Sequence, residues 1–492
     1  MPDRRQESYA VRLEAAELAR SREHPAHLAN GDEQRYAGDK YFMSFTKGLP
    51  HNEKTGLLED PQDFVEFRRA IDDGFIDPFS DRVRHGARYE VKDGKIVDNL
   101  CSTNKDDIDN IKKLRQWEAP TAGVVFDLEG PDAQAVTMPP APPLLDAAGL
   151  INPELVFEMA EVYELAHLRD QPFNDFESTS SNKTVTDVIA RLNALDYIKD
   201  HKDCCEQSGR PRKVDADGNL DLQTVFRGSS PGVDVGPYLS QFLLLGNTDV
   251  NEGGGSVAQG LITYGVLNID QRVPIAKPGK DYMITMGDYV EVQRGLDPGR
   301  EEYVPEPKPP EGISARPARR FISTPRDLAT YVHYDALYEA YLNACLILLG
   351  MKTPFDTGFD QLSGGGSASG QAATRRNASG FALYGGPHIL TLVTEVATRA
   401  LKAVRFQKFN SHLRLRPEAL AARIELSRQK DDGILPETVQ VPRSLITHMD
   451  EFRRLLNTNN AGTENSTLGA IMACTEGKMF LPMAFPEGSP MH

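Results

Sequence analysis

Apolar side chains recur at helical spacing in several stretches of this chain, and this pattern constrains its fold more than any other feature. An amphipathic helix buries one apolar stripe, so a chain that repeats the pattern must pack helices against one another. Pro153, Pro325, Pro387 and Pro417 mark helix starts, because proline fits the first helical turn. The predicted helices are 5–22, 61–73, 105–117, 153–165, 184–200, 324–346, 387–404 and one that begins at 417. The sequence therefore predicts a mainly α protein, a helical bundle with long loops.

Composition divides the chain into three parts. Residues 1–145 are a loop-rich N-terminal segment with some helices, and residues 146–320 are a first helical bundle region. Residues 321–492 are a third part with the most regular helical pattern. Prolines crowd 303–317, which predicts a stiff linker across the surface of the bundle region.

Charge and cysteine content exclude several classes of protein. Lys and Arg total 55 against 71 for Asp and Glu, a formal net charge of −16. A chain this acidic is a poor partner for nucleic acid or an anionic membrane surface, since phosphate groups attract Lys and Arg. The five cysteines form no CxxC pair, which argues against a zinc site or a disulfide scaffold. No apolar run approaches the ~18 residues that span a bilayer, and the N-terminus has no secretory apolar core, so we expect a cytoplasmic protein.

One segment departs from the acidic composition. Residues 396–417 contain His412, no Asp or Glu, and the basic residues Arg399, Lys402, Arg405, Lys408, Arg414 and Arg416. One interpretation is a solvated helix face that pairs with acidic neighbours. The other is an oxyanion pocket, in which Lys408 at a helix end and Arg416 beside the next helix's N-terminus converge on one tetrahedral anion.

The same region resembles a known family. The run 386–399, continuing through 405–408 to 413–419, is similar to the vanadium-dependent haloperoxidases, most closely to the algal and cyanobacterial bromoperoxidases. Stretches 44–51, 236–242 and 321–327 agree with the same family, so the resemblance covers nearly the whole chain. The Lys-x7-Arg-Pro spacing at Lys408 is shared more loosely with acid and lipid phosphatases of the same superfamily.

The resemblance implies a fold, a cofactor and a reaction. Vanadate would sit in a helical bundle of the haloperoxidase and acid phosphatase-like type, and 321–492 would be the first part of that catalytic bundle. Lys408 and Arg416 match two of the groups that neutralise its oxygens, and the lysine of the family also polarises bound peroxide. The partners implied are hydrogen peroxide, a halide (bromide or iodide in preference to chloride) and small organic acceptors. Family members assemble as dimers or larger rings, so a homo-oligomer is expected.

The sequence also departs from the family pattern. The family completes its pocket with a Ser-Gly-His segment, a further Arg and a His that coordinates vanadium, and the 492 residues contain no Ser-Gly-His triplet. His492 matches a pocket histidine that precedes that segment in the family. The catalytic bundle is thus expected to be incomplete at its C-terminus, with no metal ligand and with weak activity or none. The alternatives are a truncated non-catalytic remnant or assembly protein, and a phosphatase of the same superfamily.

A structural calcium is the remaining cofactor question. Algal-type members often hold calcium in the loop that corresponds to 353–380, and calcium needs clustered carboxylate and carbonyl oxygens. Only Asp356 and Asp360 are acidic in this loop. The composition therefore favours an open loop over a calcium site.

Overall fold

The computed structural model describes residues 4–23, 25–72, 90–92, 95–97, 135–177, 182–200, 210–230, 232–236, 245–247, 256–257, 260–295, 302–307, 316–333, 336, 338–351, 353, 385–457 and 466–486. Within these ranges helices dominate and the strands form short pairs, so the predicted mainly α fold is confirmed. None of the helices in the described ranges is both long and apolar enough to cross a membrane. The predicted helix 105–117, the acidic residues of loop 353–380 and His492 lie outside the described residues.

The chain divides into two compact units. Unit 1 comprises Met1–Gly236, Lys277–Glu302 and Lys402–His492, and unit 2 comprises Pro237–Ala276 and Tyr303–Leu401. Each unit is thus built from segments that are distant in sequence. The three-part division of the chain at residues 145 and 320 stays a prediction.

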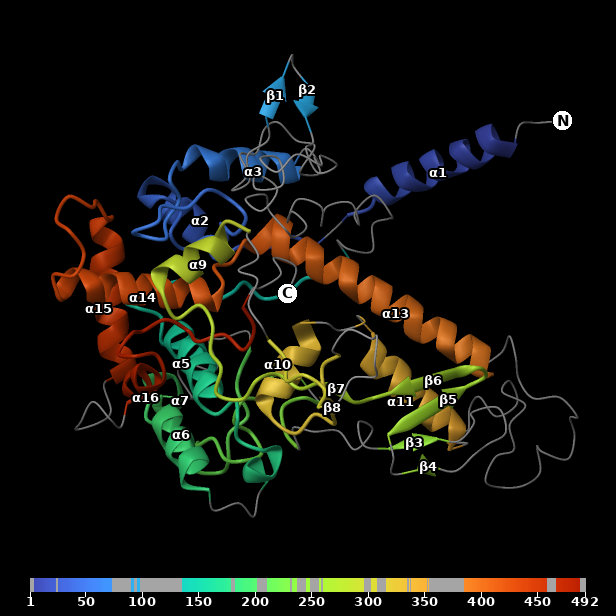
Figure 1. Ribbon diagram of the computed structural model, residues 1–492. Coiled ribbons are helices and arrows are strands. Elements are labelled where there is room, and N and C mark those ends of the chain that lie inside the picture. Colours follow the sequence, from blue (N-terminus) through green and yellow to red (C-terminus); the bar gives the residue numbers. More distant parts are fainter. Residues whose placement is uncertain are drawn as a thin grey trace, which may run out of the picture. The chain divides into compact units, whose positions relative to one another are not determined.

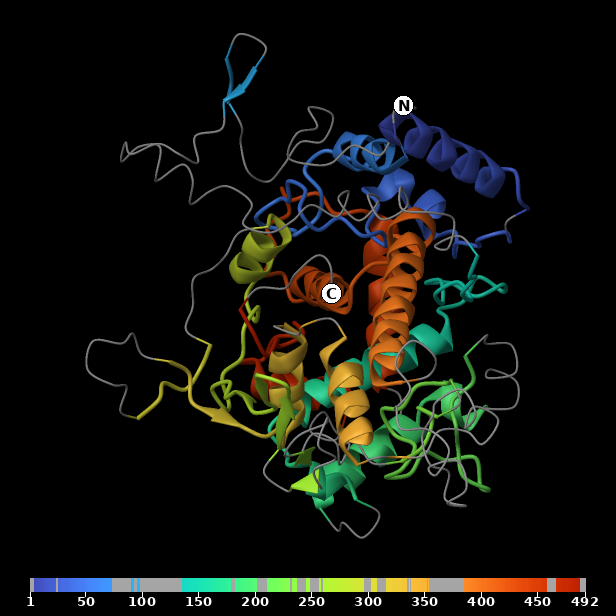
Figure 2. The same cartoon turned by 90° about the vertical axis from the view of Figure 1, so that its right-hand side faces the viewer.

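Unit 1 is a bundle of helices. Its described elements are α1 (Arg4–Arg20), α2 (Asp32–Arg35), η1 (Ala37–Asp39), α3 (Gln62–Asp72), the hairpin β1 (Glu90–Lys92) and β2 (Lys95–Val97), α5 (Pro153–His167), η5 (Phe173–Phe176), α6 (Lys183–Asn193), α7 (Asp196–Lys199), α9 (Met286–Gln293), η8 (Gln407–His412), α14 (Pro417–Asp431), α15 (Arg443–Asn457) and α16 (Thr467–Cys474). Helix α14 packs on α15, and both α15 and α16 pack on α5 (Figures 1 and 2). The C-terminal part of the described chain therefore closes the core of this unit.

Local sequence signals set several helix starts in unit 1, whereas tertiary contacts set some of the ends. The side chain of Asn152 caps α5 by accepting a hydrogen bond from the backbone N–H of Glu154 at 2.9 Å. The predicted helix 184–200 is interrupted, because α6 ends at Asn193 and Leu195 is extended. At this break the Asn193 amide pairs with both backbone groups of Leu220, at 2.9 and 2.8 Å. A side chain engaged in this way favours a helix end over its continuation.

Unit 2 combines short antiparallel strand pairs with helices. Its elements are β3 (Gly246–Asn247), β4 (Ser256–Val257), β5 (Leu261–Tyr264), β6 (Leu267–Asp270), β7 (Val273–Pro274), β8 (Arg319–Arg320), α10 (Pro325–His333), α11 (Glu339–Gly350) and most of α13 (Gly386–Phe406). Ile262 of β5 packs with Leu346 and Ile347 of α11 in a buried cluster (Figure 1). The prediction of one continuous helix over 324–346 is wrong, because α10 ends at His333 and α11 begins at Glu339. The two helices pack on different strands: α10 on β7, and α11 on β3 and β5.

The proline-rich stretch 303–317 is tied to neighbouring backbone at its described ends. Val304 N–H donates to Ile275 O at 2.9 Å, and Glu306 N–H donates to Arg316 O at 2.8 Å. The backbone of these ends is thus held in extended pairs within unit 2.

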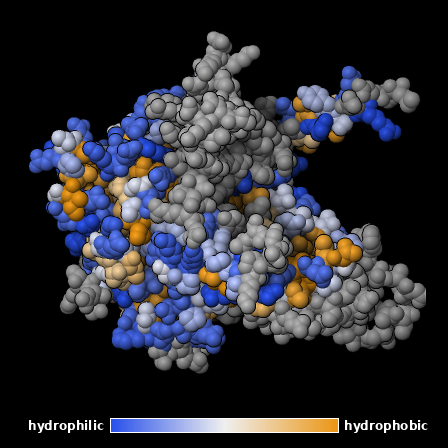
Figure 3. All heavy atoms as spheres, viewed as in Figure 1, coloured by the Kyte–Doolittle hydropathy of each residue, from blue (hydrophilic) through white to orange (hydrophobic). Residues whose placement is uncertain are grey.

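The face of the molecule in Figure 3 is mostly hydrophilic, with scattered apolar side chains. Helix α1 is an exception, because four of its large apolar residues are exposed: Tyr9, Val11, Leu13 and Leu18. Exposed apolar side chains of this size are candidates for contact with another chain.

Candidate oxyanion site

A π-helical turn positions Lys408. The α-helical winding of α13 ends at Phe406, and η8 continues it with the wider π geometry through His412. Phe409 in this turn is buried among Phe45, Phe67 and other apolar side chains, which anchors the segment. Lys408 Nζ lies 5.1 Å from the centroid of the Phe409 ring. Single π turns inside helices are frequent at functional sites, because they redirect side chains.

Arg416 stands at the start of the next helix. Leu413 ends the π turn in the left-handed region, at φ 37°, and the chain then runs extended to Arg416, the N-cap residue of α14. Pro417 occupies the first helical position, as predicted, and Glu418 follows in the first turn. The positive end of the α14 dipole therefore lies next to both Arg416 and Glu418.

A segment near the N-terminus completes the cluster by backbone pairing. Phe45 N–H donates to Leu413 O at 2.7 Å, and Ser44 forms an antiparallel bridge with Arg414. This pairing carries Lys47 into the interior, where its side chain is 1% exposed and its Nζ lies 3.6 Å from Glu418 Oε1. The same oxygen of Glu418 accepts a hydrogen bond from Arg416 Nε at 2.5 Å. One buried carboxylate thus joins two cations that come from opposite ends of the chain.

The pKa values of these groups reflect their mutual charge. Burial and then the positive charge of Arg416 lower the pKa of Lys47 to about 7, although Glu418 opposes them. Burial and then Arg416 also lower the pKa of Lys408 to about 7. Burial raises the pKa of Glu418, but Arg416 and Lys47 outweigh it and bring the pKa to about 2. The four groups therefore act on one another, and the excess of cations over carboxylates favours an anion among them.

The donor set fits an oxyanion. Ammonium and guanidinium groups donate hydrogen bonds to anionic oxygens, and Arg adds a planar fork. Neither group offers a lone pair to a metal ion. Within the described ranges no three His, Cys, Asp or Glu side chains are grouped so that they could hold a metal. The cluster can thus neutralise the oxygens of vanadate or phosphate.

The other predicted basic residues separate into two kinds. Arg399 is exposed and pairs with Glu395 one turn away at 2.7 Å, so this part of the basic stripe lies on a solvated helix face. Arg405 lies close enough to lower the pKa of Lys408. The position of His492 is outside the described residues.

Sequence reasoning missed Lys47 as a member of the site. The residue lies in the stretch 44–51 that resembles the haloperoxidases, but no local pattern marks it as buried. A neighbouring network fixes the same turn, because His51 contacts Thr46 Oγ1 at 3.0 Å and Leu49 O at 2.7 Å. Burial lowers the pKa of His51 to about 3, so this histidine is neutral in the folded protein. The one signal in the sequence was that Lys47 lies in the stretch 44–51, which resembles the haloperoxidases.

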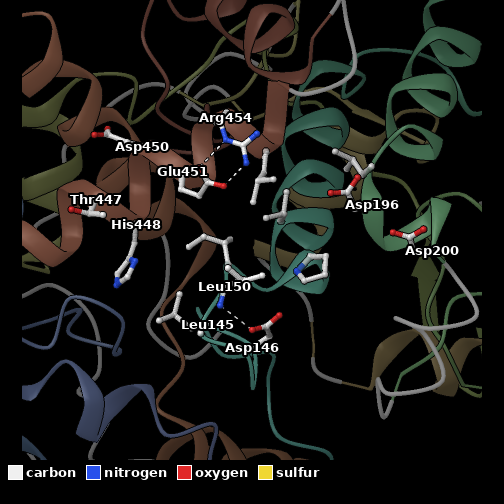
Figure 4. Close-up of a pocket in the computed structure, with 16 residues that line it drawn as sticks. Leu145, Asp146, Leu150, Asp196, Asp200, Thr447, His448, Asp450, Glu451 and Arg454 are labelled. Carbon is white, nitrogen blue, oxygen red and sulfur yellow. Dashed lines mark hydrogen bonds and ion pairs between the residues drawn. The ribbon is translucent and has the colours of Figure 1, made fainter.

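A groove in unit 1 has the opposite electrostatic character to the cation cluster. This groove encloses about 1000 Å³ between α5, α7 and α15. Figure 4 shows Asp146, Asp196, Asp200, Asp450 and Glu451 along it, with Arg454 bonded to Glu451. Carboxylates outnumber cations there, which makes the groove a poor site for an oxyanion. The candidate site is therefore the cluster of Lys47, Lys408, Arg416 and Glu418 rather than this groove.

Comparison with known proteins identifies the family. No protein-family model matches the chain. The chain is 37% identical over 516 residues to a vanadium-dependent bromoperoxidase from Corallina officinalis, covering all of this chain and 79% of the relative. A vanadium-dependent bromoperoxidase from Corallina pilulifera matches at 37% over 514 residues with the same coverage. A third, from Ascophyllum nodosum, is 26% identical over 377 residues, 76% of this chain and 55% of the relative.

A solved structure shows the same fold. The homohexameric second vanadate-dependent bromoperoxidase of Ascophyllum nodosum superposes with a TM-score of 0.61 over 99% of this chain, at 22% identity. This chain spans 66% of the length of that structure. The sequence relatives at 37% identity, over the full chain, carry the conclusion: the chain belongs to the vanadium-dependent haloperoxidase family.

Proposed function

We propose that the cluster of Lys47, Lys408, Arg416 and Glu418 binds vanadate. The protein then oxidises a halide with hydrogen peroxide to hypohalous acid, which halogenates organic acceptors, and bromide or iodide is preferred to chloride. The single observation that supports the proposal is the grouping of buried Lys47 and half-buried Lys408 and Arg416, whose charges act on one another, around the one buried carboxylate of Glu418. Because the chain belongs to the vanadium-dependent haloperoxidase family, we infer that the oxyanion is vanadate rather than phosphate.

Each residue of the cluster has a distinct part in this proposal. Arg416 presents N–H donors to the oxyanion, and Lys408 provides a mobile positive charge beside it. Glu418 orients the Arg416 guanidinium through the 2.5 Å bond to Nε. When bound, vanadate supplies Lewis-acid activation of hydrogen peroxide toward the halide. The Lys408 ammonium would polarise peroxide bound at this site and make it more electrophilic toward the halide.

Turnover by the 492-residue chain alone is expected to be weak or absent. The family resemblance assigns acid–base chemistry and vanadium coordination to histidines associated with a Ser-Gly-His segment, and that triplet does not occur in the sequence. Metal affinity depends on ligand number and geometry, so donors to the oxyanion oxygens alone give loose binding. Robust bromide oxidation by the purified chain at this mass would contradict this expectation.

We also propose that the protein is a homo-oligomer. The exposed apolar residues of α1 provide a surface for self-association, and the solved neighbour is described as a homohexamer. Light scattering coupled to size-exclusion chromatography measures the mass in solution. A monomer at micromolar concentration would overturn this part of the proposal.

Oxyanion binding tests the site directly. Calorimetric titration with orthovanadate at pH 7 should give an affinity that falls at least about tenfold in Lys408→Met and in Arg416→Met, because each loses a charged donor. The matched control is Arg399→Gln, which removes one positive charge from the exposed end of the same basic stripe. An equal fall in Arg399→Gln would show a general charge effect and refute the site. Hydrolysis of an aryl phosphate, abolished by Lys408→Met, would instead favour a phosphatase.

A further inference from the structure

Lys47 occupies a position that lysine rarely takes. Its side chain is 1% exposed, and taking an ammonium group out of water is costly unless a buried partner compensates. Its carboxylate partner is Glu418, at 3.6 Å, which is an ion-pair distance beyond that of a strong hydrogen bond. This contact places the Lys47 ammonium at the same carboxylate oxygen that accepts a hydrogen bond from Arg416.

The backbone around Lys47 is fixed on both sides. Before it, Phe45 N–H is bonded to Leu413 O at 2.7 Å, and after it Gly48 N–H is bonded to Gln293 O at 2.6 Å. The His51 contact to Thr46 closes the turn. The side chain of Lys47 thus starts from a rigid point and ends at the carboxylate of Glu418.

Glu418 transmits this rigidity to Arg416. Its Oε1 atom is the acceptor for Arg416 Nε at 2.5 Å, and the same atom faces Lys47. A carboxylate held by a second cation has less freedom to rotate than one held by Arg416 alone. The plane of the guanidinium is fixed in turn, because the bond to Nε is directional.

We propose that Lys47 is a positioning residue of the oxyanion site, which holds Glu418 and through it the Arg416 guanidinium. The inference rests on the proposed function, in which Arg416 binds the oxyanion. In this role Lys47 fixes the orientation of the Arg416 guanidinium, which is more than adding a positive charge to the site.

Variants of the ion pair separate these two actions. Lys47→Met removes the ammonium group, whereas Lys47→Met with Glu418→Gln removes the ammonium group together with the carboxylate that it faces. Lys47→Arg keeps the charge and a hydrogen-bond donor. Lys40→Met is the control for the loss of a lysine, because Lys40 bonds only carbonyl groups of Leu58 and Glu59 in the hydrogen bonds that the structure describes for it.

Orthovanadate titration by calorimetry at pH 7 gives the first readout. Positioning predicts a loss of affinity of at least about tenfold in Lys47→Met and in the double variant, near-normal affinity in Lys47→Arg, and no change in Lys40→Met. Recovery of affinity in the double variant would show that Arg416 binds the oxyanion without being held by Lys47 and Glu418, and would overturn the inference. Unchanged affinity in Lys47→Met would overturn it as well.

The Nε–H resonance of Arg416 gives a second readout that needs no ligand. The signal is assigned through Arg416→Lys, and its exchange with solvent is measured by ¹⁵N NMR. We expect slow exchange in the wild type and in Lys47→Arg, and fast exchange in Lys47→Met. Slow exchange in Lys47→Met would refute positioning whatever the affinities are. A wild-type chain that fails to bind orthovanadate, yet shows this NMR pattern, would refute the proposed function and leave the positioning role supported.

Discussion

Lys47 and Arg416 share one acceptor atom: Glu418 Oε1 lies 3.6 Å from the ammonium nitrogen and 2.5 Å from the guanidinium Nε. A segment near the N-terminus and the start of α14 thereby meet at a single buried charge. Such a centre suits the anion binding proposed above, but it also imposes a cost on folding, because like charges are held close together out of water.

The cost predicts a pH dependence of stability. The pKa of Lys47 is about 7 in the folded protein, against an ordinary value of 10.5, so the unfolded chain binds more protons between these values. Stability therefore rises with pH above 7, by roughly 1 kcal/mol per pH unit for each such lysine. Lys408 contributes in the same direction. Urea unfolding at pH 7, 8 and 9 should show a smaller rise for Lys47→Met than for the wild type, and equal slopes would contradict the assignment.

The π-helical turn gives a second prediction. Arg68 of α3 donates to the carbonyl groups of Phe409 and Asn410, at 3.1 and 2.9 Å, in the turn that carries Lys408. We expect Arg68→Ala to weaken orthovanadate binding several-fold, because carbonyl groups of a π turn need external donors to keep its geometry. The exposed neighbour Arg69 provides the matched control. Identical affinities for Arg68→Ala and Arg69→Ala would show that the turn holds without this support.

Local signals in the sequence predicted much of the fold. Pro153 and Pro417 stand at the first positions of α5 and α14, because the fixed backbone angle of proline suits a helix start whatever surrounds it. The interruption after Asn193 depends instead on the bonds of its amide to Leu220, a contact between segments that local patterns do not encode.

The residues of the candidate site also fall into two groups: those that the sequence indicated and one that only the tertiary structure brings to them. Lys408 and Arg416 lie on one short stretch whose spacing and family resemblance indicated them together. Lys47 reaches them through backbone pairing of its segment, such as the bond from Phe45 to Leu413, and no spacing within the sequence reveals a pairing across so much of the chain. Its role became visible only with the tertiary structure.

Gly56 offers a test of packing beside this region. Its φ is +61°, and a Cβ built on it would lie 2.7 Å from Cε1 of the buried Tyr289 ring. Gly56→Ala should lower the free energy of unfolding by roughly 2–4 kcal/mol, from left-handed strain together with overpacking. Gly149→Ala is the control, since φ there is +80° but no atom lies within 4 Å of the added Cβ. Its cost should be only about 1 kcal/mol, and equal losses in chemical denaturation would mean that crowding by Tyr289 is relieved at no cost.

A buried ion pair provides the last prediction. Glu164 is fully buried and bonded to Arg191 by two 2.7 Å contacts, and it also accepts a hydrogen bond from Thr467 of α16 at 2.6 Å. Arg191→Met leaves this carboxylate without its cation, so we expect a loss of about 3–5 kcal/mol in the free energy of unfolding. Adding Glu164→Gln should recover part of the loss, because the buried charge is then removed as well.

The control pair is Lys183 with Asp187, at 2.6 Å on the surface of α6, where the lysine side chain is 84% exposed. Water and side-chain entropy offset most of an exposed pair, so Lys183→Met should cost no more than about 0.5 kcal/mol. Urea unfolding measures the free energy of unfolding of Arg191→Met, of Arg191→Met with Glu164→Gln, and of Lys183→Met. If Arg191→Met were as mild as Lys183→Met, solvent would have to reach Glu164, and the packing of α16 on α5 would be looser than the contacts of Thr467 indicate.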